Sequence, residues 1–163
     1  MAKPPKIPST PALRLLRAAN VTHVVHPYAY VDRGGTAASS AALGVDEHLV
    51  IKTLIFEDED ARPFVILMHG DREVSAKGLA RALGRKAVAP CAPEVAERHS
   101  GYQVGGTSPF GLKKALPVYV EASVLGLETI YINAGARGLL VALRPRVLTE
   151  LLAAQPVEVA ISG

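Results

Sequence analysis

The apolar segment LVIKTLIF contains one charged residue, Lys52. Side chains of a β-strand alternate between two faces, and both faces of this predicted strand are apolar, as in a strand covered on both sides. An unpaired ammonium is costly to bury, so Lys52 must either reach water at the edge of the strand or meet an anion. The second interpretation predicts a pocket that binds a phosphate or a developing oxyanion. The residues alone leave both open.

A second unusual segment is GYQVGGTSPFG, residues 101–111, with four glycines and a proline. Such a backbone can approach a ligand closely, and its successive N–H groups can form an anion-binding concavity. Lys113 and Lys114 follow directly and add positive charge. The alternative is a structural turn between strands. The spacing fits neither a phosphate-binding P-loop nor a dinucleotide fingerprint.

The other reactive side chains give weaker signals. His23 and His26 lie on one predicted strand but face opposite sides, and the other three histidines are isolated without a cysteine pair nearby, so no metal site is expected. Cys91 lies between two prolines in APCAP, and we expect it to pack as a small hydrophobe instead of acting as a nucleophile. Ser108 lacks the elbow pattern of serine hydrolases.

The elements that would position these residues are short and mixed. Caps, prolines and glycine stops predict helices at 11–19, 36–43, 76–83, 93–99 and 146–153. Apolar and β-branched runs predict strands at 21–31, 48–56, 63–69, 117–122, 129–133, 139–143 and 157–161. The order shows no regular βαβ rhythm, which indicates an α+β fold.

Length and composition indicate one globular unit. The chain has 163 residues, 49% apolar and 20% charged, and we expect a flexible basic arm at 1–9 followed by a single domain at 10–163. One cysteine excludes an internal disulfide framework and fits a reducing cytoplasm. No leader or membrane-length apolar run is visible, so no membrane partner is expected. A net charge of +3 permits an anionic partner but is too small to identify one.

Several segments, taken in order, resemble the YbaK/EbsC family: TPALRLL, VVHPY, VIKTLIF, GYQVGGTSPFGLKKALPVYVE and TIYINAGARGL. Proteins of that family are similar to the editing domain inserted in bacterial prolyl-tRNA synthetases. The resemblance, from about Thr10 to Ala153, implies a six- or seven-stranded mixed β-barrel surrounded by short helices. It also implies a cytoplasmic aminoacyl-tRNA deacylase that needs no cofactor. Its partner would be a tRNA acceptor end, with tRNA(Pro) expected and prolyl-tRNA synthetase as a candidate second partner.

The resemblance also implies roles for individual residues. Lys52 matches the family's functional lysine, Tyr28 matches a tyrosine of the same pocket, and residues 105–109 match a loop whose backbone faces the aminoacyl ester. By this resemblance, the catalytic residues are Lys52, Gly105 and Gly106. The substrate-binding residues are Tyr28, Thr107, Ser108, Pro109, Asn133, Gly135 and Leu140. The tRNA-binding residues are Lys113, Lys114 and Arg137.

The chain departs from the cysteine-specific members at two positions. Asn133 stands where they have serine, and Leu140 where they have aspartate. We expect these changes to broaden the preference toward other small amino acids. The predicted substrate is Cys-tRNA(Pro), with the ester of another small residue such as alanine as an alternative. Two further alternatives are a tRNA- or synthetase-binding module without turnover and an enzyme for another small ester.

The implied mechanism needs no protein nucleophile. An aminoacyl ester is already activated, so the protein has mainly to orient it and to stabilise the tetrahedral oxyanion with loop N–H groups. The attacking group would be the thiol of the substrate or a positioned water. Lys52 would hold the terminal phosphate or sugar.

Overall fold

The computed structural model describes residues 7–163. Of the predicted basic arm, residues 1–6 lie outside the described part of the chain, and Ile7 to Ser9 are exposed without regular structure. The chain then enters a helix whose first residue is Pro11.

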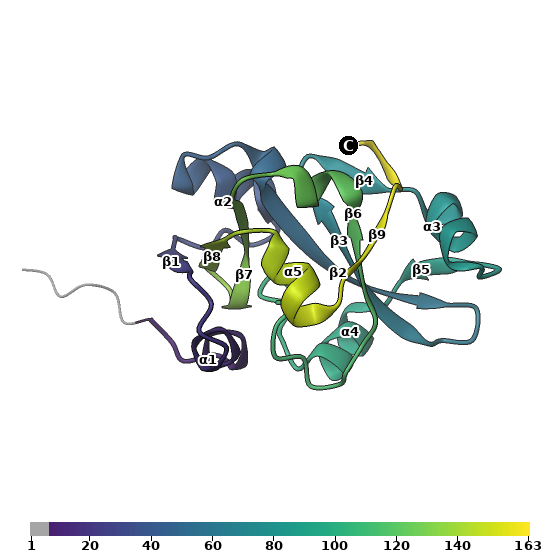
Figure 1. Cartoon of the computed structure of the whole chain (residues 1–163), viewed down its shortest axis with the longest axis horizontal. Coiled ribbons are helices and arrows are strands. Elements are labelled where there is room, and N and C mark those ends of the chain that lie inside the picture. The colour runs from purple at the N-terminus through teal and green to yellow at the C-terminus, as the bar shows by residue number, and fades with distance from the viewer. Residues whose placement is uncertain (1–6) are drawn as a thin grey trace, which may run out of the picture.

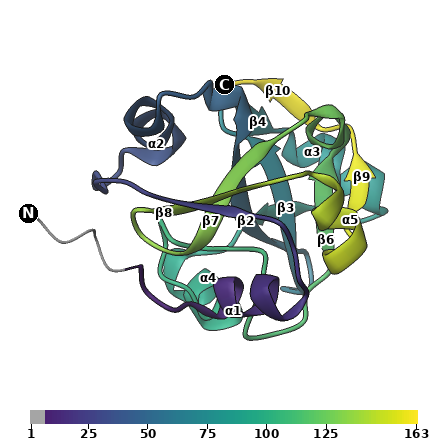
Figure 2. The ribbon, with the colours of Figure 1, turned by 60° about the vertical axis from the view of Figure 1, so that its left-hand side comes forward.

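Eight strands form one mixed sheet, which curves around an apolar interior (Figures 1 and 2). Seven of them follow one path, and β5 (Val88–Pro90) pairs with the end of β2. Along the path the order is β1 (Val24–Pro27), β8 (Leu139–Leu143), β7 (Ile130–Ala136), β2 (Val50–Asp58), β3 (Pro63–His69), β6 (Val118–Glu121) and β9 (Gln155–Val157). A separate ribbon joins β4 (Arg72–Val74) to β10 (Ala160–Ser162). The α+β class is confirmed.

The helices surround this sheet and begin where local signals predict. They are α1 (Pro11–Ala18), α2 (Gly35–Leu43), α3 (Ala76–Leu83), α4 (Pro93–Ser100) and α5 (Arg146–Leu152), with short 3₁₀ turns η1 (Glu47–Leu49) and η2 (Ala122–Gly126). The Thr10 and Ser75 side chains accept N–H groups of the first turns of α1 and α3, as N-caps do. Across the described residues, every helix is too short or too polar to span a membrane.

Two predicted strands differ from the structure. The strand expected at 21–31 is confined to β1, because its partner β8 begins at Leu139, opposite Pro27. The closing strand expected at 157–161 is divided into β9 and β10, which pair with different neighbours. The chain bends between them where the buried Glu121 carboxylate accepts the N–H groups of Val159 and Ala160 at 2.6 and 3.2 Å.

The core lies on both sides of β2, as its alternation predicts. Ile51 and Ile55 belong to the larger cluster, which also receives α1 and α5. Phe56 and Leu54 belong to the smaller cluster, which α3 covers. Burial on both faces fixes the register of β2, because a shift of one residue would exchange the two faces. Thr53 and Lys52 therefore leave the strand in opposite directions.

We expect Thr10→Ala to lower the free energy of unfolding by about 1–2 kcal/mol, since it removes two hydrogen bonds. The Thr10 hydroxyl accepts the N–H of Leu13 at 3.1 Å and donates to the carbonyl of Ala134 in β7 at 2.6 Å. Ser75→Ala is the matched control, because it removes only the cap of α3. Denaturant titration of both variants tests this: an equal loss in the two would show that the Thr10–Ala134 bond adds nothing.

Candidate active site

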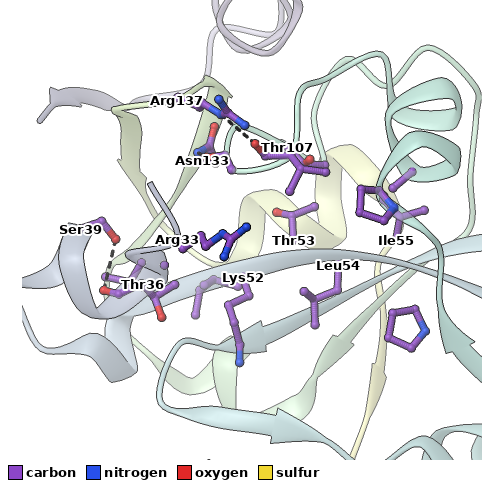
Figure 3. A pocket seen from close by; sticks show the side chains of 18 of the residues that line it. Arg33, Thr36, Ser39, Lys52, Thr53, Leu54, Ile55, Thr107, Asn133 and Arg137 are labelled. Atoms are coloured by element: carbon purple, nitrogen blue, oxygen red, sulfur yellow. Dashed lines mark hydrogen bonds between the residues drawn. The ribbon is translucent and has the colours of Figure 1, made fainter. Parts of the chain in front are cut away.

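A cavity of about 870 Å³ lies against β2 and is lined by all residues from Val50 to Phe56 (Figure 3). On this edge β7 pairs only with Val50 and Ile51, and β5 pairs only with the last three residues, Phe56–Asp58. Directly after β5, the N–H of Cys91 donates to the carbonyl of Ile55 at 2.9 Å, so within the described chain residues 52–54 lack a strand neighbour on that side. The cavity occupies a gap in the sheet, beside a backbone that the ladder leaves open.

Lys52 lines this cavity, but its ammonium is directed to the β4 side. The Nζ atom donates to the carbonyl of Arg72 and lies 3.6 Å from a carboxylate oxygen of Glu73. The side chain is 19% exposed. Figure 3 shows Lys52 and Thr53 on opposite sides of the strand. The lysine therefore meets a carboxylate and a carbonyl at the rim of the cavity, and its ammonium still reaches water.

The glycine-rich loop is fastened to β7 by one side chain. The Asn133 amide donates from Nδ2 to the carbonyl of Gly105 at 3.1 Å, and its Oδ1 accepts the N–H of Gly135 at 2.8 Å. Both ends of the amide are thus used by main chain. Asn133 was expected to bind substrate; in the structure it lines the cavity and also positions the loop.

Tyr30 and Arg137 complete the attachment of this loop. Arg137 Nε donates to the carbonyl of Val104 at 2.9 Å, and its guanidinium carbon lies 5.2 Å from the centre of the Tyr30 ring. Gly105 has a φ of +92°, and a Cβ there would lie 2.6 Å from the Tyr30 hydroxyl oxygen. The backbone conformation favours glycine at this position, and a side chain would also displace the Tyr30 hydroxyl.

The N–H of Gly106 is engaged within the loop. It donates to the carbonyl of Gln103 at 2.8 Å, and a Cβ at Gly106 would meet the backbone of Ala136 and Arg137 at 2.9 Å. Gly106 therefore lets the loop pack on the turn between β7 and β8. This hydrogen bond occupies the Gly106 N–H, which was expected to face the substrate. Gly105 and Thr107 are the neighbouring loop residues that line the cavity.

The structure separates the residues assigned from the sequence into two groups. Those that line the cavity are Lys52, Gly105, Tyr28, Thr107, Asn133, Leu140 and Arg137. The others do not line the cavity: Gly106, Ser108 and Pro109 of the loop, and Gly135, Lys113 and Lys114 outside it.

Three of these residues, Ser108, Gly135 and Lys114, have a visible structural contact. Ser108 is fully buried, and its Oγ accepts the N–H of Phe110 at 3.2 Å. A Cβ at Gly135 would lie 2.7 Å from the ring of Tyr102, so this glycine permits close packing. Lys114 is exposed, with Nζ 3.0 Å from His99 Nδ1. Ser108 and Gly135 thus shape the loop from behind, and the lysine pair lies on the outer surface.

Sequence reasoning missed several residues of the cavity wall: Tyr30, Arg33, Thr36, Ser39 and Thr53. Two of these residues could have been found from the sequence pattern. Tyr30 lies two positions after Tyr28, a spacing that places both on one side of an extended chain. Thr53 is the polar residue on the face of β2 opposite Lys52. Figure 3 shows Arg33 between the loop and β2, where it adds a third cation to Lys52 and Arg137.

Two histidines that stand apart in the sequence meet in space. His48 and His69 stack with ring centres 3.7 Å apart, and Asp71 bonds to His48 Nδ1 at 2.8 Å. His69 Nδ1 pairs with the carbonyl of His48, and its Nε2 pairs with the Ser123 hydroxyl. The donor atoms of His48, His69 and Asp71 lie within 4.8 Å of one another. Burial lowers the pKa of His69. With both His69 nitrogens occupied, the cluster ties η1 to η2 and fits a metal poorly.

Comparison with known proteins identifies the family. The model of the aminoacyl-tRNA editing domain matches residues 34–151. The chain belongs to this family. EbsC of Enterococcus faecalis, provisionally named a Cys-tRNA(Pro)/Cys-tRNA(Cys) deacylase, is 31% identical over 160 residues, or 98% of each chain. The proline–tRNA ligase of Nitratidesulfovibrio vulgaris is 34% identical over 87 residues, which are 53% of this chain and 15% of the ligase.

A solved structure agrees with this assignment at the level of the fold. The protein, provisionally described as a trans-editing enzyme for prolyl-tRNA synthetase, superposes with a TM-score of 0.80 at 22% identity. The match covers 96% of this editing domain and all of that chain. The resemblance seen in the sequence is confirmed. An editing domain cleaves the ester of an aminoacyl-tRNA, so this chain is a hydrolase.

Gly105→Ala should reduce kcat/KM for deacylation at least tenfold, because the new methyl meets Tyr30 and the φ of +92° is strained for alanine. Gly126→Ala is the matched control, since a Cβ there meets nothing within 4 Å. Initial rates with one mischarged tRNA compare the two variants. Full activity in Gly105→Ala would show that the loop geometry is not needed.

Cys91→Ala should keep at least half of the wild-type kcat/KM. Cys91 lines the cavity, but burial raises the pKa of its thiol to about 11, so the nucleophilic thiolate is scarce at neutral pH. The measurement is deacylation at pH 7, together with mass spectrometry of the quenched wild-type reaction. An acyl adduct on Cys91 would contradict the expectation.

Proposed function

We propose that this editing domain is a trans-acting deacylase that removes cysteine from Cys-tRNA(Pro) in the cytoplasm. The observation that carries the proposal is the cavity itself, where the glycine-rich loop faces the open edge of β2. The match to EbsC over nearly its whole length supports action as a separate protein. Prolyl-tRNA synthetase is a candidate partner, because the matched region is also part of proline–tRNA ligases.

In this proposal the loop stabilises the oxyanion. Gly105 and Thr107 line the cavity, and their N–H groups would be the donors. Loss of one such donor typically costs about 10²–10³ in rate. Water, or the thiol of the cysteinyl group, attacks the ester carbonyl. The bond from the carbonyl carbon to the ribose oxygen breaks, and the ribose oxygen takes a proton. The chain's own residues orient the ester and hold the developing charge.

The cations around the cavity would hold the acceptor end. An ammonium has three donors, so Lys52 can keep its bonds to the β4 side and still donate to a phosphate or sugar oxygen. Arg33 and Arg137 line the same cavity. Lys113 and Lys114 lie outside it, where they would meet the backbone of the tRNA farther from the ester.

Alanine is the second candidate for the amino acid removed, because one wall of the cavity is apolar. Leu140 is 3% exposed and lies opposite Asn133 across the β7–β8 pair. With the Asn133 amide bonded to main chain, neither residue offers a free charge to the amino acid. Apolar walls discriminate by about 10–200-fold per methylene at most.

A panel of tRNA(Pro) carrying cysteine, alanine, serine or proline tests the proposal. We expect the largest kcat/KM for the cysteinyl ester and the smallest for the prolyl ester. A larger kcat/KM for the alanyl ester than for the cysteinyl ester would make alanine the assigned amino acid in place of cysteine. Binding without turnover on every member would show a binding module instead of an enzyme.

Lys52→Ala should lower kcat/KM at least a hundredfold while the fold is kept, because it removes the only lysine in the cavity wall among the described residues. Lys86→Ala is the control, since that exposed lysine does not line the cavity. Rates and thermal unfolding are measured side by side. More than half of the wild-type rate in Lys52→Ala would refute its role.

A further inference from the structure

The Thr53 hydroxyl oxygen is buried and lacks a hydrogen-bond partner in the described part of the chain. Buried hydroxyls normally find a partner, and one that does not destabilises the folded state. Thr53 nevertheless lies in the middle of β2, where valine would fill the same space without that penalty. An unpaired hydroxyl at the wall of a ligand cavity indicates that its partner is the ligand.

The position of Thr53 places it in the gap of the sheet. It lies within the stretch of β2 that neither β7 nor β5 covers, so the space beside it is open to a ligand. Figure 3 shows its side chain on the side of β2 that faces Thr107 and Asn133, away from Lys52. The Thr53 side chain thus lies on the side of the loop that would hold the ester, with its hydroxyl oxygen buried in this structure, and the Lys52 ammonium is directed to the β4 side.

The residues around the Thr53 hydroxyl favour an uncharged group of the ligand beside it. Its neighbours along the same face, Ile51 and Ile55, are buried and apolar, and the protonated thiol of Cys91 also lines the cavity. A substrate ammonium would be poorly solvated there. A hydroxyl both donates and accepts, so it can pair with another hydroxyl or with a thiol. A rotation about χ1 exchanges the Thr53 methyl and hydroxyl and lets the hydroxyl follow the ligand.

We infer that Thr53 is a specificity residue that hydrogen-bonds the side-chain hydroxyl or thiol of the amino acid esterified to the tRNA. The inference rests on the proposed function and narrows its substrate class to small amino acids with one heteroatom on the β-carbon. The alanyl group cannot make this bond and leaves the Thr53 hydroxyl unpaired. Serine gains more than cysteine, because a thiol is a weak donor and acceptor.

The test is Thr53→Val, which keeps the shape and removes the hydroxyl. A typical neutral hydrogen bond corresponds to about 2- to 13-fold in an equilibrium constant. We expect kcat/KM for the seryl ester of tRNA(Pro) to fall about tenfold, that for the cysteinyl ester to fall about threefold, and that for the alanyl ester to stay the same. Thr53→Ser should retain the wild-type order. The melting temperature of Thr53→Val should equal or exceed that of the wild type, since no internal bond is lost.

A second measurement separates this inference from the proposed function. Non-hydrolysable amide analogues of seryl- and alanyl-adenosine are titrated into wild type and Thr53→Val. A lower serine-to-alanine affinity ratio in the variant supports the role of Thr53, whether or not the wild type hydrolyses any ester. Absence of hydrolysis by the wild type would refute only the proposed deacylase function. An unchanged ratio, or an equal loss for all esters together with a lower melting temperature, would overturn the role of Thr53.

Discussion

The interrupted hydrogen-bond ladder on one edge of β2 is the constraint on which the site depends. β7 pairs in parallel with its first residues, and β5 with the following Cys91 bonds to its last, so residues 52–54 between them lack a ladder partner on this edge. An uncovered strand edge offers backbone donors and acceptors to whatever lies beside it. In this protein a ligand cavity lies there. Continuous pairing would bury the segment and leave no room for an ester.

The glycine-rich loop forms the opposite wall, and it is held by contacts that glycine alone permits. Asn133 and Arg137 bond to the carbonyls of Gly105 and Val104, so β7 and the turn after it hold the loop at a fixed distance from β2. This arrangement is typical of preorganised sites, where donors are oriented before the charge develops. The loop is thus supported by side chains that bond to two of its carbonyls, and Gly105 and Thr107 of the loop line the cavity.

The C-terminal strands also contribute to the site, although they lie far from the loop. β10 pairs with β4, and β4 supplies the carbonyl and carboxylate that hold the Lys52 ammonium. Glu121 in turn fixes the bend that separates β9 from β10 by accepting two N–H groups. Buried carboxylates need such partners, so this bend is specified by hydrogen bonding. The position of the lysine is therefore linked to the end of the chain.

The sequence by itself determined the features that depend on neighbours a few residues apart. Caps at Thr10 and Ser75 predicted the helices, the alternation in β2 predicted burial on both faces, and the motifs predicted the family. Only the tertiary structure decided which distant atoms pair: the Lys52 ammonium with β4, and the Asn133 amide with the loop. The physical reason is that hydrogen-bond partners far apart in the chain are chosen by strand register and topology, and periodicity within a segment does not contain that information.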